Sequence, residues 1–141
     1  MSGKVFDRIH TGDSHTLEKT ITEEMVGIFA DLTGDYNPVH TDDAYCREHG
    51  TGSRMVHGML TLSFLSTLVG MHLPGNGSVW MSQSMDFITP VRIGETIRIT
   101  GTVTGKESGG MLPLDMVHMK VDITGTDGRK IARGRIRVAV R

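Results

Sequence analysis

The segment 55–85 contains no Asp, Glu, Lys or Arg, although these residues make up 22% of the chain. Its apolar residues are interrupted by Gly, Ser, Thr and His, so it lacks the unbroken run of about 18 apolar residues that a membrane span requires. Within it, residues 58–73 (GMLTLSFLSTLVGMHL) place Leu, Met, Phe or Val on nearly every side of a helix. A helix that is apolar all round must be covered all round. The sequence therefore predicts a buried helix over 58–73 that ends at Pro74-Gly75.

Four β-rich segments follow this helix, at residues 78–88, 96–106, 114–124 and 130–140. Apolar and polar residues alternate in the last three, which is the pattern of a strand with one buried and one solvated face. The last two segments are joined through Asp127-Gly128, a dipeptide typical of β-hairpins. The second half of the chain thus predicts an antiparallel sheet.

The residues before the buried helix predict one more strand and two shorter helices. Residues 15–21 form the strand, and Thr22 is the expected N-cap of a helix that ends at Gly34. A short helix over 42–49 is expected to begin after a cap at Thr41. The first of these helices carries an expected apolar stripe of Met25, Ile28, Phe29 and Leu32.

This order of elements favours an α+β fold, in which a single antiparallel sheet wraps around one long buried helix. With 141 residues and no linker, the chain is expected to form one domain, 1–141. Such a sheet is expected to bury all sides of the helix. The outer edge of the sheet or the end of the helix still needs a cover, and a second copy in a homodimer is the expected one. A net charge of −1 argues against binding to nucleic acid or to a membrane surface. The N-terminus has no signal-peptide pattern, so a cytoplasmic location is the expectation.

The densest group of reactive side chains is GDYNPVH at 34–40. Pro38 fixes its own φ and holds the preceding residue extended, so the loop is stiff. A stiff loop can direct the Asp35 carboxylate and the His40 imidazole into one small volume, as an acid–base pair requires. The alternative is a turn in which Asp35 bonds the backbone and His40 acts as a cap.

A second candidate lies at the start of the buried helix, where Gly58 can bring its amide close to a carbonyl oxygen that gains negative charge. The alternative is that this glycine only permits tight packing. Ser66 is a hydroxyl on the same helix, where most such groups bond back to the preceding turn. The lone Cys46 is expected to be a structural or surface thiol. The histidines have no ligand-like spacing, so no metal is expected.

The last strand carries Arg133, Arg135 and Arg137 on one face. Such a row is usually a solvated face that discourages edge pairing. The alternative is that these side chains attract a phosphorylated ligand.

Taken together, GDYNPVH at 34–40, VHGML at 56–60 and Ser66 resemble the MaoC-like, (R)-specific enoyl-CoA hydratases, whose fold is the hotdog. The resemblance implies reversible hydration of trans-2-enoyl-CoA to (R)-3-hydroxyacyl-CoA by a dimeric enzyme. It further implies that Asp35 and His40 hold the water, that Asn37 orients the site and that the Gly58 amide binds the thioester oxygen. Ser66 matches the active-site serine of the family.

No metal or organic cofactor is implied, because coenzyme A is part of the acyl-CoA substrate. Two alternatives remain open at this point. One is a hotdog acyl-CoA thioesterase, and the other is a module that binds acyl-CoA without turnover.

Overall fold

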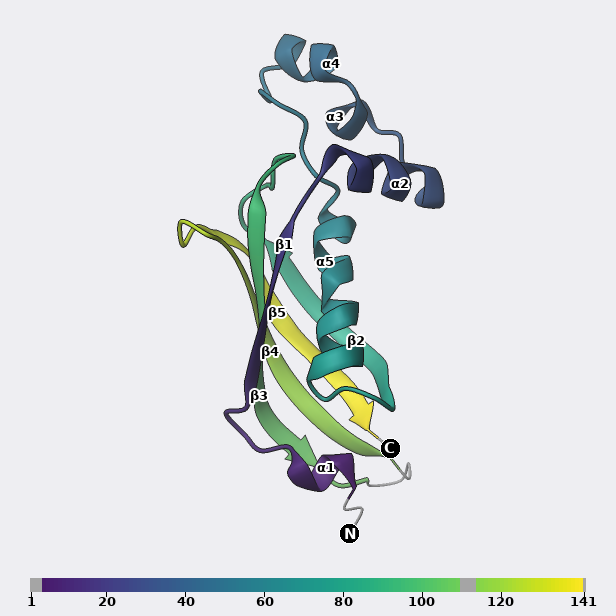
Figure 1. Cartoon of the computed structure of the whole chain (residues 1–141), viewed down its shortest axis with the longest axis vertical. Helices are drawn as coiled ribbons and strands as arrows, with labels where there is room; N and C mark the ends of the chain where they lie inside the picture. The colour runs from purple at the N-terminus through teal and green to yellow at the C-terminus, as the bar shows by residue number, and fades with distance from the viewer. Residues whose placement is uncertain (1–3, 110–113, 141) are drawn as a thin grey trace.

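The computed structural model describes residues 4–109 and 114–140, which form one five-stranded antiparallel sheet curved around a central helix (Figure 1). The helices are α1 (Val5–Arg8), α2 (Glu23–Thr33), α3 (Pro38–Thr41), α4 (Asp43–Glu48), α5 (Gly58–Thr67) and the π-helical η1 (Leu68–His72). The strands are β1 (Ser14–Thr20), β2 (Ser78–Phe87), β3 (Thr96–Glu107), β4 (Asp115–Gly125) and β5 (Lys130–Val140). Their spatial order is β1-β3-β4-β5-β2, so β1 and β2 are the two edges. The expected α+β architecture is confirmed.

Alternation along the strands positions the core. On β4, Val117, Met119 and Val121 are almost fully buried, whereas His118 and Lys120 between them are not. The hairpin to β5 closes where the sequence predicts it, and the Gly125 amide donates to the Arg129 carbonyl at 2.8 Å. The inner face of the sheet is therefore apolar and the outer face polar.

The helix α5 packs on this inner face through Leu60 and Leu65, and η1 continues the contact through Leu68. A Cβ added at Gly101 of β3 would lie 2.8 Å from a Leu68 methyl group, so the strand needs a glycine where the helix approaches. The sequence predicts that this helical segment is covered all round. In the structure it is covered only in part, because Met59 and Met71 remain exposed. One sheet can cover only one side of the helix, and the other side stays open within a single chain.

Two local predictions about the first helices are corrected. In α2 the Thr22 cap and the left-handed Gly34 are confirmed. Of the expected apolar stripe, Met25 and Phe29 pack against the core, but Ile28 is 59% and Leu32 80% exposed. The fully buried residues are Val26 and Ala30, because α2 presents a face about one residue further round to the core.

The short helix α4 is capped by the Asp42 carboxylate, which accepts from the Tyr45 amide at 3.0 Å, rather than by Thr41. Thr41 instead belongs to α3, where its hydroxyl donates to the Asn37 carbonyl at 3.3 Å. No helix in the described part of the chain is both long enough and apolar enough to span a membrane.

Candidate functional site

Helices α2, α3 and α4 gather at the end of the molecule where α5 begins (Figure 1). The loop between α2 and α3 is held by two successive side-chain turns. The Asp35 Oδ1 accepts from the Asn37 amide at 3.1 Å, and the Asn37 Oδ1 accepts from the Val39 amide at 3.2 Å. Asn37 thereby caps α3, in which Pro38 takes the first position. The backbone turn expected as an alternative for Asp35 is therefore present, and it uses only one carboxylate oxygen.

The other carboxylate oxygen, Asp35 Oδ2, lies 4.0 Å from His40 Nε2. On the opposite side of the ring, His40 Nδ1 lies 2.7 Å from the Met55 carbonyl oxygen. A carbonyl oxygen only accepts, so Nδ1 carries the hydrogen, and in the neutral imidazole the lone pair is on Nε2. The His40 side chain is 14% exposed and that of Asp35 50%, so the pair borders solvent at one side only.

His57 supports both members of this pair, a role that sequence reasoning missed. Its ring is 2% exposed and stacks on His40 with a centroid distance of 4.0 Å. His57 Nε2 lies 3.0 Å from the backbone carbonyl oxygen of Asp35, so it donates to that oxygen. The available signal was a histidine next to Gly58 in VHGML, but only the tertiary structure shows what it contacts.

A cavity of about 310 Å³ connects His40 with Gly58, and Thr61 and Phe87 also line it. A Cβ at Gly58 would lie 2.8 Å from Phe87 Cζ, so a larger residue at this position would have to displace the half-exposed Phe87 ring. Gly58 is also the first residue of α5, where the amide has no partner within the helix. Both expectations for Gly58 are therefore compatible with the structure.

Ser66 lies apart from these residues. It borders a second cavity of about 440 Å³, whose walls include Met59, Leu62, Trp80 and Met85. Ser66 follows Gly58 by eight positions on the helix, or roughly 12 Å along its axis. The structure thus connects Asp35 with Gly58 through His40, and places Ser66 on a separate, mainly apolar cavity.

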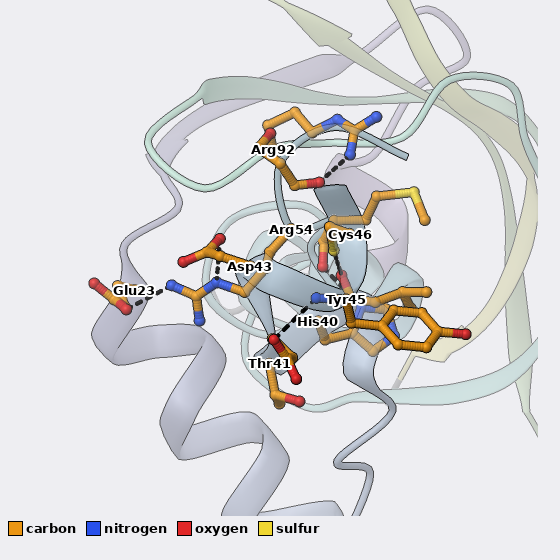
Figure 2. A network of polar contacts seen from close by, with 12 residues as sticks. Glu23, His40, Thr41, Asp43, Tyr45, Cys46, Arg54 and Arg92 are labelled. Carbon is orange, nitrogen blue, oxygen red and sulfur yellow. Dashed lines mark hydrogen bonds and ion pairs between the residues drawn. The ribbon is translucent and has the colours of Figure 1, made fainter. Parts of the chain in front are cut away.

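Arg54 holds the surroundings of the site together (Figure 2). Its Nη2 lies 2.5 Å from Glu23 Oε1 at the start of α2, and its Nε lies 3.2 Å from Asp43 Oδ1 at the start of α4. The hydrogen bond to Glu23 raises the pKa of the Arg54 guanidinium above its ordinary value, and the negative charge of Asp43 adds to this effect. Arg54 thereby joins two helices to the segment that leads into His57.

The thiol of Cys46 is buried beneath α3, with Sγ 3.5 Å from the Val39 carbonyl oxygen. This position agrees with a structural role for the thiol.

One group of potential metal ligands occurs at the site. Asp35, His40 and His57 offer atoms within 4.8 Å of one another. However, the two imidazole rings are stacked with an interplanar angle of 28°, and one nitrogen of each ring already faces a backbone carbonyl oxygen. This geometry suits a pair of rings that support each other better than a common metal ion.

Comparisons with known proteins identify the relatives of this arrangement. The model of the MaoC like domain matches residues 7–124. An (R)-specific enoyl-CoA hydratase of Rhodospirillum rubrum is 43% identical over 100 residues, which cover 71% of this chain and 69% of that protein. A 3-hydroxybutyryl-CoA dehydratase of Methylorubrum extorquens is 36% identical over 94 residues, covering 67% of this chain and 60% of that protein. The crystal structure of an (R)-hydratase from Aeromonas caviae superposes with a TM-score of 0.87 at 29% identity, covering 94% of this chain and 98% of that one.

Proposed function

This chain belongs to the MaoC-like domain family, and from that premise we propose that it is an (R)-specific enoyl-CoA hydratase. The reaction is the reversible addition of water to a trans-2-enoyl-CoA, giving an (R)-3-hydroxyacyl-CoA. The observation that carries the proposal is the pairing of His40 Nε2 with Asp35 Oδ2, together with the cavity that His40 and Gly58 both line. Every step uses protein groups, and coenzyme A enters as part of the substrate.

Asp35 and His40 position and activate the water. Two acceptors 4.0 Å apart can both contact one water molecule that lies about 2.8 Å from each. The lone pair on His40 Nε2 receives a proton from this water as its oxygen bonds to C3. The pair then returns one proton to C2. A positioned acid or base of this kind contributes about 10²- to 10⁴-fold to the rate.

The Gly58 amide stabilises the intermediate. When water adds to C3, the electrons of the C2=C3 double bond move toward the thioester oxygen, which becomes negative. A free N–H at the start of a helix can donate to that oxygen, and the helix dipole adds a favourable partial charge. Loss of one such donor typically costs about 10²- to 10³-fold in rate.

The larger apolar cavity is the proposed place for the acyl chain. Met59, Leu62 and Met85 give it pliable apolar walls, and Ser66 provides one polar group there. Asn37 has a positioning role in this scheme, because its side chain fixes the start of α3, which carries His40.

A homodimer through β2 completes the proposal. β2 is an edge of the sheet, and exposed apolar side chains cluster along it and on the open side of the central helix. They are Met59, Met71, Val79, Met81, Phe87 and Ile88. A second copy that pairs along β2 would cover this surface and form hydrogen bonds with the unpaired backbone groups of the edge strand. The cytoplasmic location expected from the sequence stays a prediction.

The decisive experiment is hydration of crotonyl-CoA, followed by loss of the enoyl absorbance and by chiral analysis of the product. Asp35→Asn and His40→Ala are each expected to lose about 10²-fold or more in kcat while the fold is kept. His49→Ala, a substitution of the exposed histidine at the C-cap of α4, is the matched control and should remain active. Activity near wild type in both site variants would refute the proposal. Release of free coenzyme A thiol would identify a thioesterase instead.

A further inference from the structure

The outer face of the sheet, turned away from α5, contains a groove of about 730 Å³ that crosses β2, β3, β4 and β5. Neither Asp35, His40 nor Gly58 lines it, so it is separate from the candidate active site. Its polar lining includes Ser82, Ser84, His118, Lys120, Arg135 and Arg137. The proposed hydratase chemistry uses none of these side chains.

The strand register places like charges side by side in this groove. Arg135 on β5 lies directly opposite Lys120 on β4, and its neighbour on the other side is Ser84 on β2. Directly opposed residues on one face have Cβ atoms about 5 Å apart, and like charges at that separation are destabilising. The row continues on β3 with Thr102, opposite Lys120, so hydroxyl residues flank the two cations.

In the neighbouring cross-strand row of the same face, residues of opposite charge lie side by side. Arg133 lies two residues before Arg135 on β5, and its cross-strand neighbours are Asp122 on β4 and Asp86 on β2. The register thus places an acidic residue on each side of Arg133. Arg135 has no acidic residue directly opposite it on either neighbouring strand, so the two rows of this face differ in the charges that they pair.

The third cation, Arg137, extends the positive charge along the groove. Its Nε donates to the Ser82 hydroxyl at 2.9 Å, and its β4 neighbour is His118. One carboxylate, Glu107, also borders the groove, with its Oε1 3.0 Å from His118 Nε2. Within residues 4–109 and 114–140, Lys120, Arg135 and Arg137 form no ion pair with a carboxylate within 4.0 Å.

We propose that this groove is a binding site for the diphosphate group of a phosphorylated small molecule. Two guanidinium groups and one ammonium group supply charge-assisted donors, and the serine hydroxyls supply neutral ones. A diphosphate placed between Lys120 and Arg135 turns their mutual repulsion into two attractions. The site does not depend on the proposed hydratase activity.

The test is calorimetric titration of the whole chain with inorganic pyrophosphate at about 0.15 M ionic strength, where exposed charges are screened beyond about 8 Å. Saturable binding is expected, and Arg135→Gln and Lys120→Gln should each weaken it about tenfold or more. Arg133→Gln is the matched control, from the same strand and face, and should retain binding. Absence of saturable binding, or equal losses in Arg133→Gln and Arg135→Gln, would overturn the proposal.

Thermal unfolding in phosphate-free buffer separates binding from folding. Arg135→Gln should unfold at or above the wild-type midpoint, because it removes a like-charge contact. At the same concentration, pyrophosphate should raise the midpoint of the wild type by more than that of Arg135→Gln, which binds it more weakly. Equal stabilisation of both proteins would contradict a site built around Arg135.

Two competitors identify the source of the diphosphate. Displacement of pyrophosphate by ADP but not by coenzyme A would indicate a free nucleotide, and displacement by both would indicate recognition of the diphosphate on either carrier. Displacement by neither would identify an adventitious ion only and would refute the assignment.

Discussion

At the scale of single residues, the site depends on contacts that fix two imidazole rings. The Met55 carbonyl fixes the hydrogen of His40 on Nδ1, and the Asp35 carbonyl fixes a hydrogen of His57 on Nε2. Met55 lines the cavity of the site, and Asp35 is itself a member of the pair. The orientation of His40 and the position of the Asp35 backbone are therefore coupled through His57, whose ring contacts both.

Replacing His57 tests this coupling. His57→Phe keeps an aromatic ring against His40 but cannot donate to the Asp35 carbonyl, so kcat should fall about tenfold to a hundredfold. KM for crotonyl-CoA should change little, because His57 is buried and does not line either cavity. His57→Gln, which regains an N–H donor, should recover part of the kcat. An equal loss in both variants, or a rise in KM alone, would contradict a positioning role.

At the scale of elements, sequence patterns predict the strands well and the helices less completely. The bounds of β2 to β5 agree with prediction to within one residue, because alternation and turn dipeptides act locally. The buried face of α2 does not follow from its own pattern. Val26 and Ala30 are buried because of the way in which the helix packs on the rest of the fold. His57 and Arg54 were missed for the same reason, because their partners are far away in the sequence.

The junction of α2, α4 and the segment before α5 should depend on Arg54. Arg54→Met keeps much of the apolar stem but removes the contacts with Glu23 and Asp43. Because both carboxylates are largely exposed, the expected loss in the free energy of unfolding is only about 1 kcal/mol. Urea unfolding measures this loss. The control is Arg98→Met on β3, which removes an exposed ion pair to Glu18 on β1 and is expected to change stability less. A loss of several kcal/mol would show that the guanidinium has a larger structural role.

At the scale of the whole molecule, one chain leaves its central helix half covered. Composition and pattern predict that this helix must be enclosed, and the sheet encloses one side of it. The exposed methionines on the other side explain why the prediction is only partly met within a single chain. The proposed second copy would supply the missing cover.

A charge placed on the edge strand tests that assembly. Val79 is exposed on β2, and Val79→Lys would bring a lysine into the proposed contact between copies. We expect a shift from dimer to monomer, measured by size exclusion with light scattering. Ser14→Lys, on the opposite edge strand β1, should leave the mass of the dimer in solution unchanged. A monomeric wild type, or a dimer that tolerates Val79→Lys but not Ser14→Lys, would rule out pairing along β2.

The hydrogen bond between His40 and the Met55 carbonyl has a consequence for the reversibility of the proposed reaction. With its hydrogen fixed on Nδ1, the imidazole meets water during addition and the 3-hydroxyl during elimination through the same nitrogen, with no ring flip in between. Neither direction then requires a reset of the catalyst. Hydration and dehydration can therefore alternate on one enzyme molecule without a rearrangement of the imidazole.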